Sequence, residues 1–449
     1  MTEGPVNADV KTAVAPELLR LLEQELDKIE ARDAQFPLSI SVHAPQLEPW
    51  QWLSANRALT SIAWSDRETE KTTATVGEAA RVDVAPGQDL STCVAQCRTI
   101  LGVNQELKFF GGVSFDGSAN WRSFGAGKFV LPRLQLLDGA LTLAVIDEED
   151  IATARLDLKK TRFENEPVFK NFSEFESRTN LPNFGGWQSR IDEALSLIRS
   201  EVIEKIVLAR QTVMKFGQPL NPIALAERLQ ASTNDCFVFS FGFGNQSAFV
   251  GATPERLFLR QGDRLESEVI AGTRMRGEDS TDDERLAIEL LTSDKDQREH
   301  DIVRKSIRQR LHKFIDHLQV DSQASILRLA RKQHLRSGVK GTLKTEVDDG
   351  MLLKRLHPTP AVGGYPTENA LPEIARIEPF NRGWYAAPVG WIAAESAQFV
   401  VAIRSGLIEG NSLSLFSGAG IVRGSDPHQE WQEVENKIQD YISVLGAGS

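Results

Sequence analysis

Residues 417–438 combine small and charged side chains in a pattern that suits the joint binding of an anion and a cation. The first four, Ser-Gly-Ala-Gly, allow backbone N–H groups to approach a ligand closely, because two of the positions lack a Cβ. Glu430, Glu433 and Lys437 then fall at i, i+3 and i+7, on one face of a predicted helix. The small residues predict a loop of bare backbone, and two carboxylates and an ammonium beside it could hold a hard cation together with an anionic substrate. The same spacing also suits a solvent-exposed helix face with an ordinary Glu433–Lys437 pair.

A lysine and a glutamate further upstream provide a possible base and a possible acid. Lys205 opens the apolar run 205–210, and a lysine at a strand entrance usually extends its ammonium into solvent. If the amine is instead partly removed from water, its pKa falls from about 10.4 towards neutrality and it can act as a base. Glu255 follows a proline that fixes a turn after the hairpin predicted for residues 237–252. It is either part of a surface turn or a carboxyl group of raised pKa that serves as a general acid.

Three further segments could contribute to a site. Arg404 ends an apolar strand, where it either binds a carboxylate with both arms of its guanidinium or forms an ion pair at the rim. Residues 357–366, HPTPAVGGYP, contain too much Pro and Gly for a helix or a central strand, which predicts a structured loop lining a site. Residues 271–274, Ala-Gly-Thr-Arg, predict a bend after a strand. Glu299 lies in a densely charged stretch that is typical of a solvated helix face.

Helices and short strands must position these side chains. Apolar residues at helical spacing predict helices over residues 15–32, 187–204, 282–318 and from Pro427 onward, the last with Ser425 or Asp426 as its N-cap. Alternating or apolar runs bounded by Gly, Pro and Asp predict strands. They cover residues 38–42, 59–64, 108–115, 124–129, 141–146, 237–243, 248–252, 387–392 and 398–404. Residues 147–150 and 160–185 are polar and predict a surface loop or linker.

The composition excludes several classes of function. The chain has 449 residues and a net charge of −11, which argues against a nucleic-acid or anionic membrane partner. No apolar run reaches the ~18 residues of a membrane-spanning helix, and no signal-peptide pattern opens the chain, so we expect a cytoplasmic protein. Cys93, Cys97 and Cys236 are expected to be reduced thiols. The histidines show no zinc-binding spacing, and no nucleotide-binding glycine loop or serine-hydrolase motif is present.

The order of the motifs along the chain resembles that of the chorismate-utilising enzymes, and within them the isochorismate synthases. The motifs are EKIVLARQ at 204–211, GATPERL at 251–257, AGTRMRG at 271–277, REHDIV at 298–303, HPTPAVGGYP at 357–366, AIRSG at 402–406 and SGAGIVRGSDPHQEWQEVENK at 417–437. The resemblance covers residues 185–445 densely, whereas the N-terminal half matches chiefly at FFGGVSFDG and FGAGKFVLPR. EPFNRGWYAAPVGW at 378–391 resembles the branch that serves menaquinone or phylloquinone synthesis.

The resemblance implies an α+β fold, with a β-sandwich core of two large antiparallel sheets wrapped by helices. Residues 1–180 would form an N-terminal scaffold half and residues 181–449 a chorismate-binding catalytic half of one integrated unit. It also implies a reversible isomerisation of chorismate to isochorismate, dependent on Mg²⁺, by a monomer or weak homodimer. A small molecule is thus the expected partner.

The resemblance also assigns roles to individual residues. Lys205 matches the base that activates water for attack at C2, and Glu255 matches the acid that protonates the departing C4 hydroxyl. Glu299 and Glu433 match magnesium ligands, with Glu430 near the metal directly or through water, and magnesium prefers such oxygen ligands. The remaining positions match substrate contacts. They are Gly272, Thr273, Gly418, Ala419, Gly420 and Lys437 at the ring carboxylate, Arg404 and Tyr385 at the enolpyruvyl carboxylate, and His357, Ala361 and Val362 in the 357–366 loop.

Three alternatives remain open at this stage. Family members that use ammonia lack this base-lysine pattern, typically carry threonine at the position of Ala361 and need a glutaminase; no glutaminase-like segment is present here, and we expect no glutamine amidotransferase partner. Salicylate synthases share the lysine and the glutamates, eliminate pyruvate from isochorismate, and typically also carry that threonine. The third alternative is a non-catalytic carboxylate-binding protein on the same fold, whose mark would be the loss of Lys205, Glu255 or a metal-binding glutamate.

Overall fold

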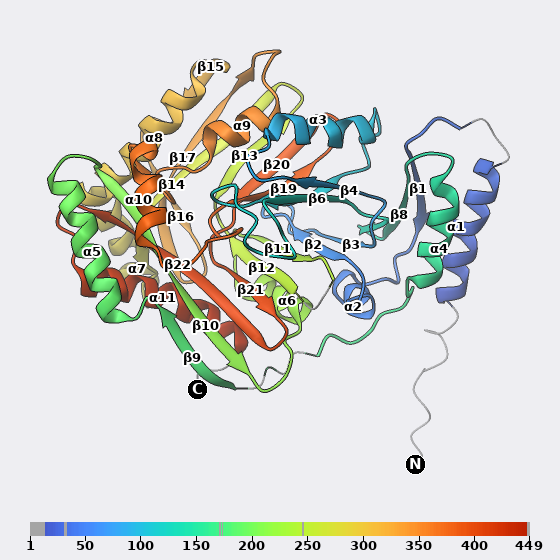
Figure 1. Ribbon diagram of the computed structural model, residues 1–449, viewed down its shortest axis with the longest axis horizontal. Coiled ribbons are helices and arrows are strands. Elements are labelled where there is room, and N and C mark those ends of the chain that lie inside the picture. The colour runs from blue at the N-terminus through green and yellow to red at the C-terminus, as the bar shows by residue number, and fades with distance from the viewer. Residues whose placement is uncertain (1–13, 31–33, 170–171, 173, 245–246, 447–449) are drawn as a thin grey trace.

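Two large antiparallel sheets form the centre of the molecule in the computed structural model, which describes residues 14–30, 34–169, 172, 174–244 and 247–446. Helices gather at both ends and along the outer surfaces of the sheets (Figure 1). The expected α+β fold with two large antiparallel sheets is therefore confirmed.

The first sheet contains twelve strands among the described residues. Their order is β1 (Leu38–His43), β8 (Ala140–Val145), β7 (Leu134–Leu137), β3 (Thr72–Val76), β2 (Ser61–Ser65), β11 (Phe237–Gly242), β12 (Ser247–Thr253), β21 (Ser405–Glu409), β22 (Ser412–Val422), β10 (Lys205–Phe216) and β18 (Gly364–Tyr365), with β9 (Phe175–Leu181) also paired to β10. The long pairing of β10 with β22 places Lys205 opposite Val422 and Leu208 opposite Ala419.

The second sheet contains ten strands in the described part of the chain. Their order is β15 (Ile315–Val320), β17 (Lys332–Leu343), β14 (Arg264–Met275), β13 (Arg256–Gln261), β20 (Ser396–Val401), β19 (Pro388–Ile392), β5 (Phe109–Val113), β6 (Gly127–Leu131) and β4 (Ala80–Val84), with β16 (Ser325–Arg328) paired to β17. Each sheet thus contains strands from both sides of residue 180, joined where β11 pairs with β2 and where β19 pairs with β5.

The helices cover these sheets. They are α1 (Val14–Glu30), α2 (Pro49–Ala55), α3 (Leu90–Leu101), α4 (Asp150–Lys160), α5 (Phe184–Arg199), α6 (Pro222–Ser232), α7 (Ser280–Thr292), α8 (Asp294–Leu311), α9 (Asp349–Leu356), α10 (Thr367–Ile377) and α11 (Pro427–Leu445). The helix α11 begins as its sequence predicts, because the Asp426 side chain accepts hydrogen bonds from the backbone N–H groups of His428 and Gln429 and Pro427 occupies the first turn. Trp431 on this helix is partly buried, and Val434 is buried.

Two hydrophobic cores hold the layers together. The larger one contains buried residues of both sheets and of helices from both sides of residue 180, α3 and α5 among them. The smaller one lies at the end of the first sheet, where α1 and α4 pack beside β1 and β8 (Figure 1). Leu18, Leu22 and Leu26 of α1 are fully buried there, because their spacing places them on one face of the helix.

Several predicted elements differ from the structure. The helix predicted over 282–318 is two helices, because Ser293 adopts an extended conformation and caps α8 through a hydrogen bond from the Asp296 N–H. That second helix ends at Leu311, and Leu318 lies in strand β15. The predicted loop at 160–185 contains strand β9, and the helices α2, α3, α4, α6, α9 and α10 were not expected. Residues 31 and 32 of the first predicted helix lie outside the described residues.

Two glycine-containing segments that were predicted as a bend and a loop are parts of strands. Gly272 lies inside β14, at a bulge in its pairing with β17, where its φ of +79° favours glycine. Residues 417–420 continue strand β22 up to Val422 instead of forming a loop before α11. The backbone that a ligand could approach closely therefore belongs to strands of the two sheets and not to a loop.

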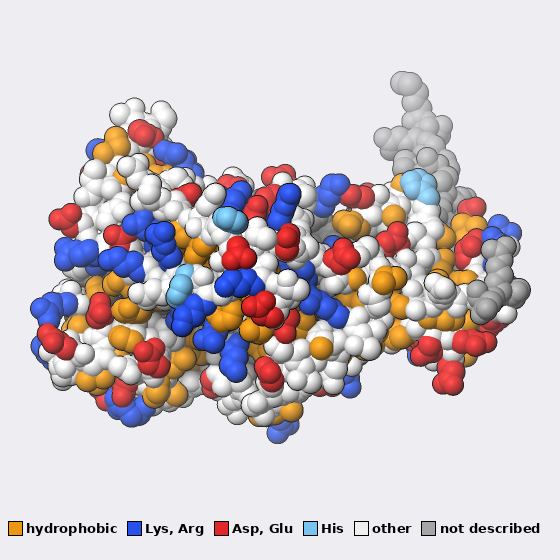
Figure 2. Space-filling view, turned by 90° about the horizontal axis from the view of Figure 1, so that it is seen from above, with side chains coloured by type: hydrophobic (Ala, Val, Ile, Leu, Met, Phe, Trp, Pro, Cys, Tyr) orange, Lys and Arg blue, Asp and Glu red, His pale blue; other side chains and the backbone are white. Residues whose placement is uncertain are grey.

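The surface agrees with the overall composition. On the face shown in Figure 2, Lys and Arg side chains are interspersed with Asp and Glu side chains. Of the helices described, none has the length and apolar character needed to span a bilayer.

Candidate active site

One cavity brings together most of the residues that the sequence singled out. It has a volume of about 300 Å³. Among the residues that line it are residues of β14, α8, β22 and α11, of the turn before β13 and of the loop near residue 361. The predicted site residues that line it are Glu255, Gly272, Thr273, Glu299, Ala361, Val362, Tyr385, Arg404, Gly418, Gly420, Glu430, Glu433 and Lys437. Segments far apart in the sequence therefore meet at one place.

Three predicted residues do not line this cavity. Lys205 is one of them, but its ammonium reaches Glu299, which does line the cavity. Ala419 points to the opposite face of β22 from its two glycine neighbours, because side chains alternate along a strand, and it is buried in the core. His357 packs edge-on against Phe115 and places its Nε2 3.2 Å from the Phe115 carbonyl oxygen. The structure thus joins His357 to the N-terminal half of the chain.

Lys205 is fully buried at the start of β10. Its Nζ donates a hydrogen bond of 2.7 Å to Glu299 Oε1, and the same two atoms form an ion pair. The strand β22 makes room for this side chain at Gly420, because a Cβ there would lie 2.9 Å from Lys205 Cε. The usual solvent-facing position of a strand-entrance lysine is therefore excluded.

Glu255 occupies a buried turn between β12 and β13. Its backbone N–H donates to Thr253 Oγ1 at 3.2 Å, and its carbonyl oxygen accepts from the Val401 N–H at 3.0 Å. Burial raises the pKa of the Glu255 carboxyl to about 8, and the negative charge of Glu268 adds to the rise, while Lys205 opposes it. A carboxyl group in this state keeps its proton at neutral pH and can donate it.

Three carboxylates converge on the cavity from two helices. Glu299 comes from α8, and Glu430 and Glu433 come from successive turns of α11. Glu433 accepts a hydrogen bond from Lys437 Nζ at 2.7 Å, and the charge of this lysine lowers the pKa of Glu433. Burial raises the pKa of Glu430, and repulsion from Glu433 contributes to the same shift. The cavity wall therefore carries carboxylates whose mutual repulsion is only partly compensated.

These carboxylates suit a hard divalent cation chemically. Oxygen ligands of this kind are those that Mg²⁺ prefers, and a cation would relieve the repulsion between Glu430 and Glu433. Across the described ranges, no group of three His, Cys, Asp or Glu side chains is already close enough to enclose a metal ion. Glu299 and Glu433 are instead neutralised by Lys205 and Lys437.

Another part of the cavity wall is basic. Arg404, held at a φ of +51°, donates from Nη2 to His334 Nε2 at 2.9 Å. Burial, together with the charges of Arg404 and Lys437, keeps the pKa of His334 well below its usual range, so the ring is neutral. His334 Nδ1 can then carry the proton, and it lies 3.3 Å from the Gly272 carbonyl oxygen and 3.1 Å from Thr273 Oγ1. This histidine has no sequence neighbours that mark it, and its importance emerges only from the fold.

Aromatic packing fixes a further side chain that lines the cavity. The ring of Tyr385 stacks on Phe416 with a centroid distance of 5.3 Å. Burial raises the pKa of the Tyr385 hydroxyl, so it remains a neutral hydrogen-bond donor. A Cβ at Gly418 would lie 3.3 Å from this hydroxyl, and Lys437 Nζ donates to the Gly418 carbonyl oxygen at 2.9 Å. Strand β22 thus gathers a phenol and an ammonium around one glycine.

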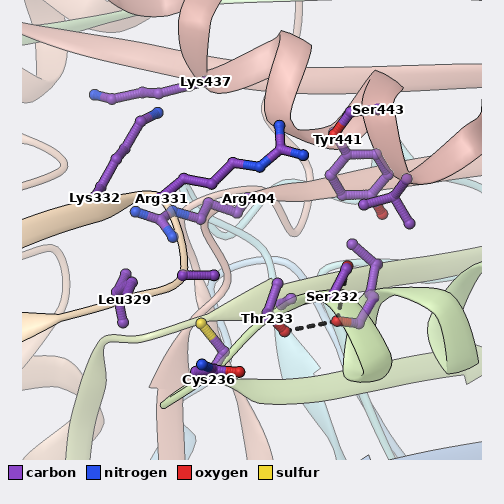
Figure 3. A pocket seen from close by; sticks show the side chains of 15 residues that line it. Ser232, Thr233, Cys236, Leu329, Arg331, Lys332, Arg404, Lys437, Tyr441 and Ser443 are labelled. Carbon is purple, nitrogen blue, oxygen red and sulfur yellow. Dashed lines mark hydrogen bonds between the residues drawn. The ribbon is translucent and has the colours of Figure 1, made fainter. Parts of the chain in front are cut away.

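A second, smaller pocket adjoins the cavity and shares three of its residues. It has a volume of about 70 Å³ and shares Arg404, Lys437 and Tyr441 with the larger cavity. Arg331, just before β17, and Lys332, the first residue of β17, add two more basic side chains, and Figure 3 shows them on the same side as Arg404 and Lys437. Basic side chains thus extend from the cavity into this pocket, an arrangement that favours anionic molecules.

Comparisons with known proteins match nearly the whole chain. The family model described as chorismate binding enzyme matches residues 24–446. Isochorismate synthase MenF of Escherichia coli (strain K12) is 32% identical over 447 residues, which cover 97% of this chain and 98% of the relative. Isochorismate synthase MenF of Bacillus subtilis (strain 168) is 34% identical over 358 residues, covering 75% of this chain and 74% of the relative.

A solved structure gives the same result. It is described as "Structure and Mechanism of MenF, the Menaquinone-Specific Isochorismate Synthase from Escherichia Coli". It matches with a TM-score of 0.84 and 30% sequence identity, over 96% of this chain and 99% of that chain. The similarity extends through the N-terminal half, where few motifs indicated it. The resemblance to isochorismate synthases is confirmed, and the chain belongs to the chorismate binding enzyme family.

Proposed function

We propose that this protein is an isochorismate synthase, an isomerase that converts chorismate to isochorismate for menaquinone or phylloquinone synthesis. The observation that carries the proposal is the buried Glu255, which lines the same cavity as the basic wall and holds its proton near neutral pH. The similarity of the chain to a menaquinone-specific relative supports the pathway. Ala361 also lines the cavity, at the position where the aminating and salicylate-forming members typically carry threonine.

The reaction needs one base and one acid. Lys205 is the base that takes a proton from water as the water oxygen bonds to C2 of the ring. The ring double bonds shift, the C4–O bond breaks, and Glu255 gives its proton to the departing hydroxyl, which leaves as water. The protons of Lys205 and Glu255 are restored by exchange with solvent. Substrate and product differ only in the placement of a hydroxyl and two double bonds, so we expect a readily reversible reaction.

The other residues hold the dianionic substrate. Arg404 and Tyr385 bind the enolpyruvyl carboxylate, and the neutral His334 orients Arg404 without competing for the anion. Lys437, Thr273 and the backbone around Gly418 and Gly420 bind the ring carboxylate. Ala419 contributes through its backbone only, because its side chain belongs to the core.

Magnesium is part of the proposal. Glu299 and Glu433, with Glu430 directly or through water, would hold Mg²⁺, which would supply charge neutralisation for the ring carboxylate. Two lysines neutralise carboxylates of this set, which supports a role for positive charge at this place.

Replacement of one carboxylate tests the metal assignment. Glu433→Gln should require a higher Mg²⁺ concentration for half-maximal activity, because a neutral amide binds the cation more weakly than a carboxylate. Activity titrated with MgCl₂ measures this. Gln439→Ala serves as a control, because Gln439 lies on the same helix but is exposed and bonds to Glu435 instead. An unchanged Mg²⁺ titration in Glu433→Gln contradicts the ligand role.

The activity itself is tested with purified protein, chorismate and Mg²⁺ in the absence of ammonia, followed by chromatography of the products. Isochorismate at a fixed ratio to chorismate, without pyruvate, is the expected result. Salicylate with pyruvate would assign the protein to the salicylate-forming branch. Chorismate that binds but is not consumed would identify a carboxylate-binding protein on this fold.

A further inference from the structure

The turn that carries Glu255 is held by an arginine from the other half of the chain. Arg67 follows strand β2 and is 8% exposed. Its Nη1 donates a hydrogen bond of 2.5 Å to the carbonyl oxygen of Pro254, 187 positions away in the sequence. The peptide immediately before Glu255 is therefore fixed by a side chain that belongs to neither strand flanking the turn.

The peptide immediately after Glu255 is fixed by the partner of this arginine. Glu268, a buried residue of β14, accepts a hydrogen bond of 2.8 Å from the Arg256 N–H through Oε1. The same carboxylate receives both arms of the Arg67 guanidinium, at 2.8 Å and 3.2 Å. Such a fork has a defined plane, so the Arg67–Glu268 pair ties the two peptides on either side of Glu255 into one unit.

The remaining contacts of the turn complete this arrangement. Thr253 Oγ1 donates to the Val401 carbonyl oxygen at 2.7 Å, and the Val401 N–H donates to the Glu255 carbonyl oxygen. The backbone is therefore held on one side by β20 and on the other by the Arg67–Glu268 pair. What stays available to the cavity is the Glu255 carboxyl group itself.

The charges around Glu255 come from every element that packs near it. Glu268 on β14 acts on it directly, and Lys205 on β10 acts in the opposite sense. Arg67 and Arg336 both pair with Glu268, the latter at 2.9 Å. The other charged groups of this region are Glu68, paired with Arg256, and Arg404 beside the neutral His334. The negative charge of Glu268 is thus shared between two arginines but remains next to the acid.

We propose that Arg67 and Glu268 are positioning residues for proton donation: together they hold the turn that aims Glu255 into the cavity. This inference rests on the proposed role of Glu255 as the acid. It gives the N-terminal half a part in the reaction, since Arg67 is contributed by that half.

A matched pair of variants separates positioning from general electrostatics. Arg67→Gln and Arg336→Gln each remove one cation from Glu268, but only Arg67 also donates to the Pro254 carbonyl oxygen. We expect kcat to fall about 10–100-fold in Arg67→Gln with little change in KM, the size of loss that follows a small misplacement of a reacting group. Arg336→Gln should keep kcat close to the wild-type value. Arg67→Lys, which keeps the charge and one donor, should recover part of the activity and guards against a folding defect in Arg67→Gln.

The pH profile supplies a readout that a merely structural role would not move. Glu268→Gln removes a negative charge beside Glu255, so the alkaline limb of the kcat/KM profile should move to lower pH. Equal kcat values in Arg67→Gln and Arg336→Gln, together with an unmoved alkaline limb in Glu268→Gln, would overturn the proposal.

Glu255→Gln, measured in parallel, separates the positioning role from the acid role on which it rests. Wild-type turnover in Glu255→Gln would refute the assignment of Glu255 as the acid. Loss of turnover in Glu255→Gln would support that assignment, and the Arg67 and Glu268 variants then decide the positioning role independently.

Discussion

Lys205 and Glu255 are both removed from solvent, yet their surroundings differ. Lys205 is paired with a carboxylate at 2.7 Å, whereas Glu255 faces the charge of another carboxylate as well as a lysine. Water exclusion strengthens each of these interactions, because the local dielectric constant is low. The two groups can thus take opposite parts in one reaction, although each is a buried ionisable side chain.

Replacement of the lysine tests the base assignment. Lys205→Ala should lower kcat about 10²–10⁴-fold, the usual contribution of a general base. The fold should persist, since the Glu299 side chain is 26% exposed and water can replace the ammonium. Steady-state kinetics with chorismate and circular dichroism measure the two effects. Lys215→Ala, at the exposed end of the same strand, is the control, and normal turnover in Lys205→Ala would contradict the assignment.

The raised pKa of Glu255 predicts how activity depends on pH. With a pKa of about 8, the carboxyl is protonated below that pH and can donate its proton. Titration of this group should therefore leave kcat/KM for isochorismate formation constant below about pH 8 and lower it above that pH. The profile from pH 6 to 10 measures this. A profile without a limb near pH 8 would show that another group donates the proton.

The same shift has a consequence for stability that does not depend on catalysis. The folded protein holds a proton on Glu255 that the unfolded chain, with an ordinary pKa of 4.5, has released. The contribution of this group to stability is therefore complete below pH 4.5 and is lost as the pH rises to about 8. The glutamine side chain in Glu255→Gln does not titrate. The thermal midpoint of this variant minus that of the wild type should therefore increase between about pH 5 and pH 8.

At the scale of elements, strand β22 is the part of the fold most closely adapted to the site. Its alternation turns Gly418 and Gly420 towards the cavity and Ala419 towards the core. The pairing with β10 runs along the whole strand, so the position of Gly420 relative to Lys205 is fixed by the sheet ladder. A loop, which the glycines suggested, would not fix that distance.

A methyl group added at Gly420 should therefore displace Lys205, the proposed base. In Gly420→Ala the new Cβ would lie 2.9 Å from Lys205 Cε and 3.2 Å from Glu299 Oε1, which forces the ion pair to move. We expect a fall in kcat, with a change of about 1–3 kcal/mol in the free energy of unfolding from overpacking. In Gly418→Ala the methyl meets Tyr385 Oη and the Leu208 carbonyl oxygen, so KM should rise instead. Identical kinetic changes in the two variants would refute this division.

The sequence predicted the elements that have strong periodicity and missed those without it. The hairpin of β11 and β12 and the start of α11 follow from apolar runs and from Asp426-Pro427. The break between α7 and α8 did not, because the apolar spacing continues across Ser293 while a single side-chain hydrogen bond ends the helix. Helix α2 has only seven residues, too few to establish a helical repeat.

For the site, motif order identified the residues that line the cavity, but not those that hold them. His334, Arg67 and Glu268 form hydrogen bonds with partners that are 70, 187 and 201 positions away, respectively. No local pattern encodes such contacts, since they arise only when the two sheets are assembled. The metal roles of Glu299, Glu430 and Glu433 stay predictions, as does the division of the chain at residue 180.

For the whole molecule, the strand order makes the two halves interdependent. The strand β11 pairs on one side with β2 and on the other with β12, so a strand from the N-terminal half lies inside the first sheet. The strand β19 likewise uses β5 as its neighbour in the second sheet. Arg67 adds a polar link between the halves at the Glu255 turn. Removal of either half would expose edges in both sheets.

We therefore expect the fragment of residues 181–449 to fail as an independent unit. Without β2 and β5, the exposed strands β11 and β19 would offer unpaired backbone groups and apolar side chains to other chains. Expressed alone, the fragment should be insoluble or unfold without cooperativity. Co-expression with residues 1–180 should restore its solubility and its cooperative unfolding. Solubility and denaturant unfolding measure this. A soluble, cooperatively folded and active fragment would contradict the prediction.

The pairing of β5 with β19 also bears on how the protein is made. Strand β5 is complete at Val113, while its neighbour begins at Pro388. At about 5–20 residues per second, the ribosome needs on the order of 14–55 s to bridge that distance. Throughout this interval β5 has a bare edge on the emerging chain. Slow translation lengthens that exposure, so the yield of native protein should depend on elongation speed and on chaperones that shield nascent strands.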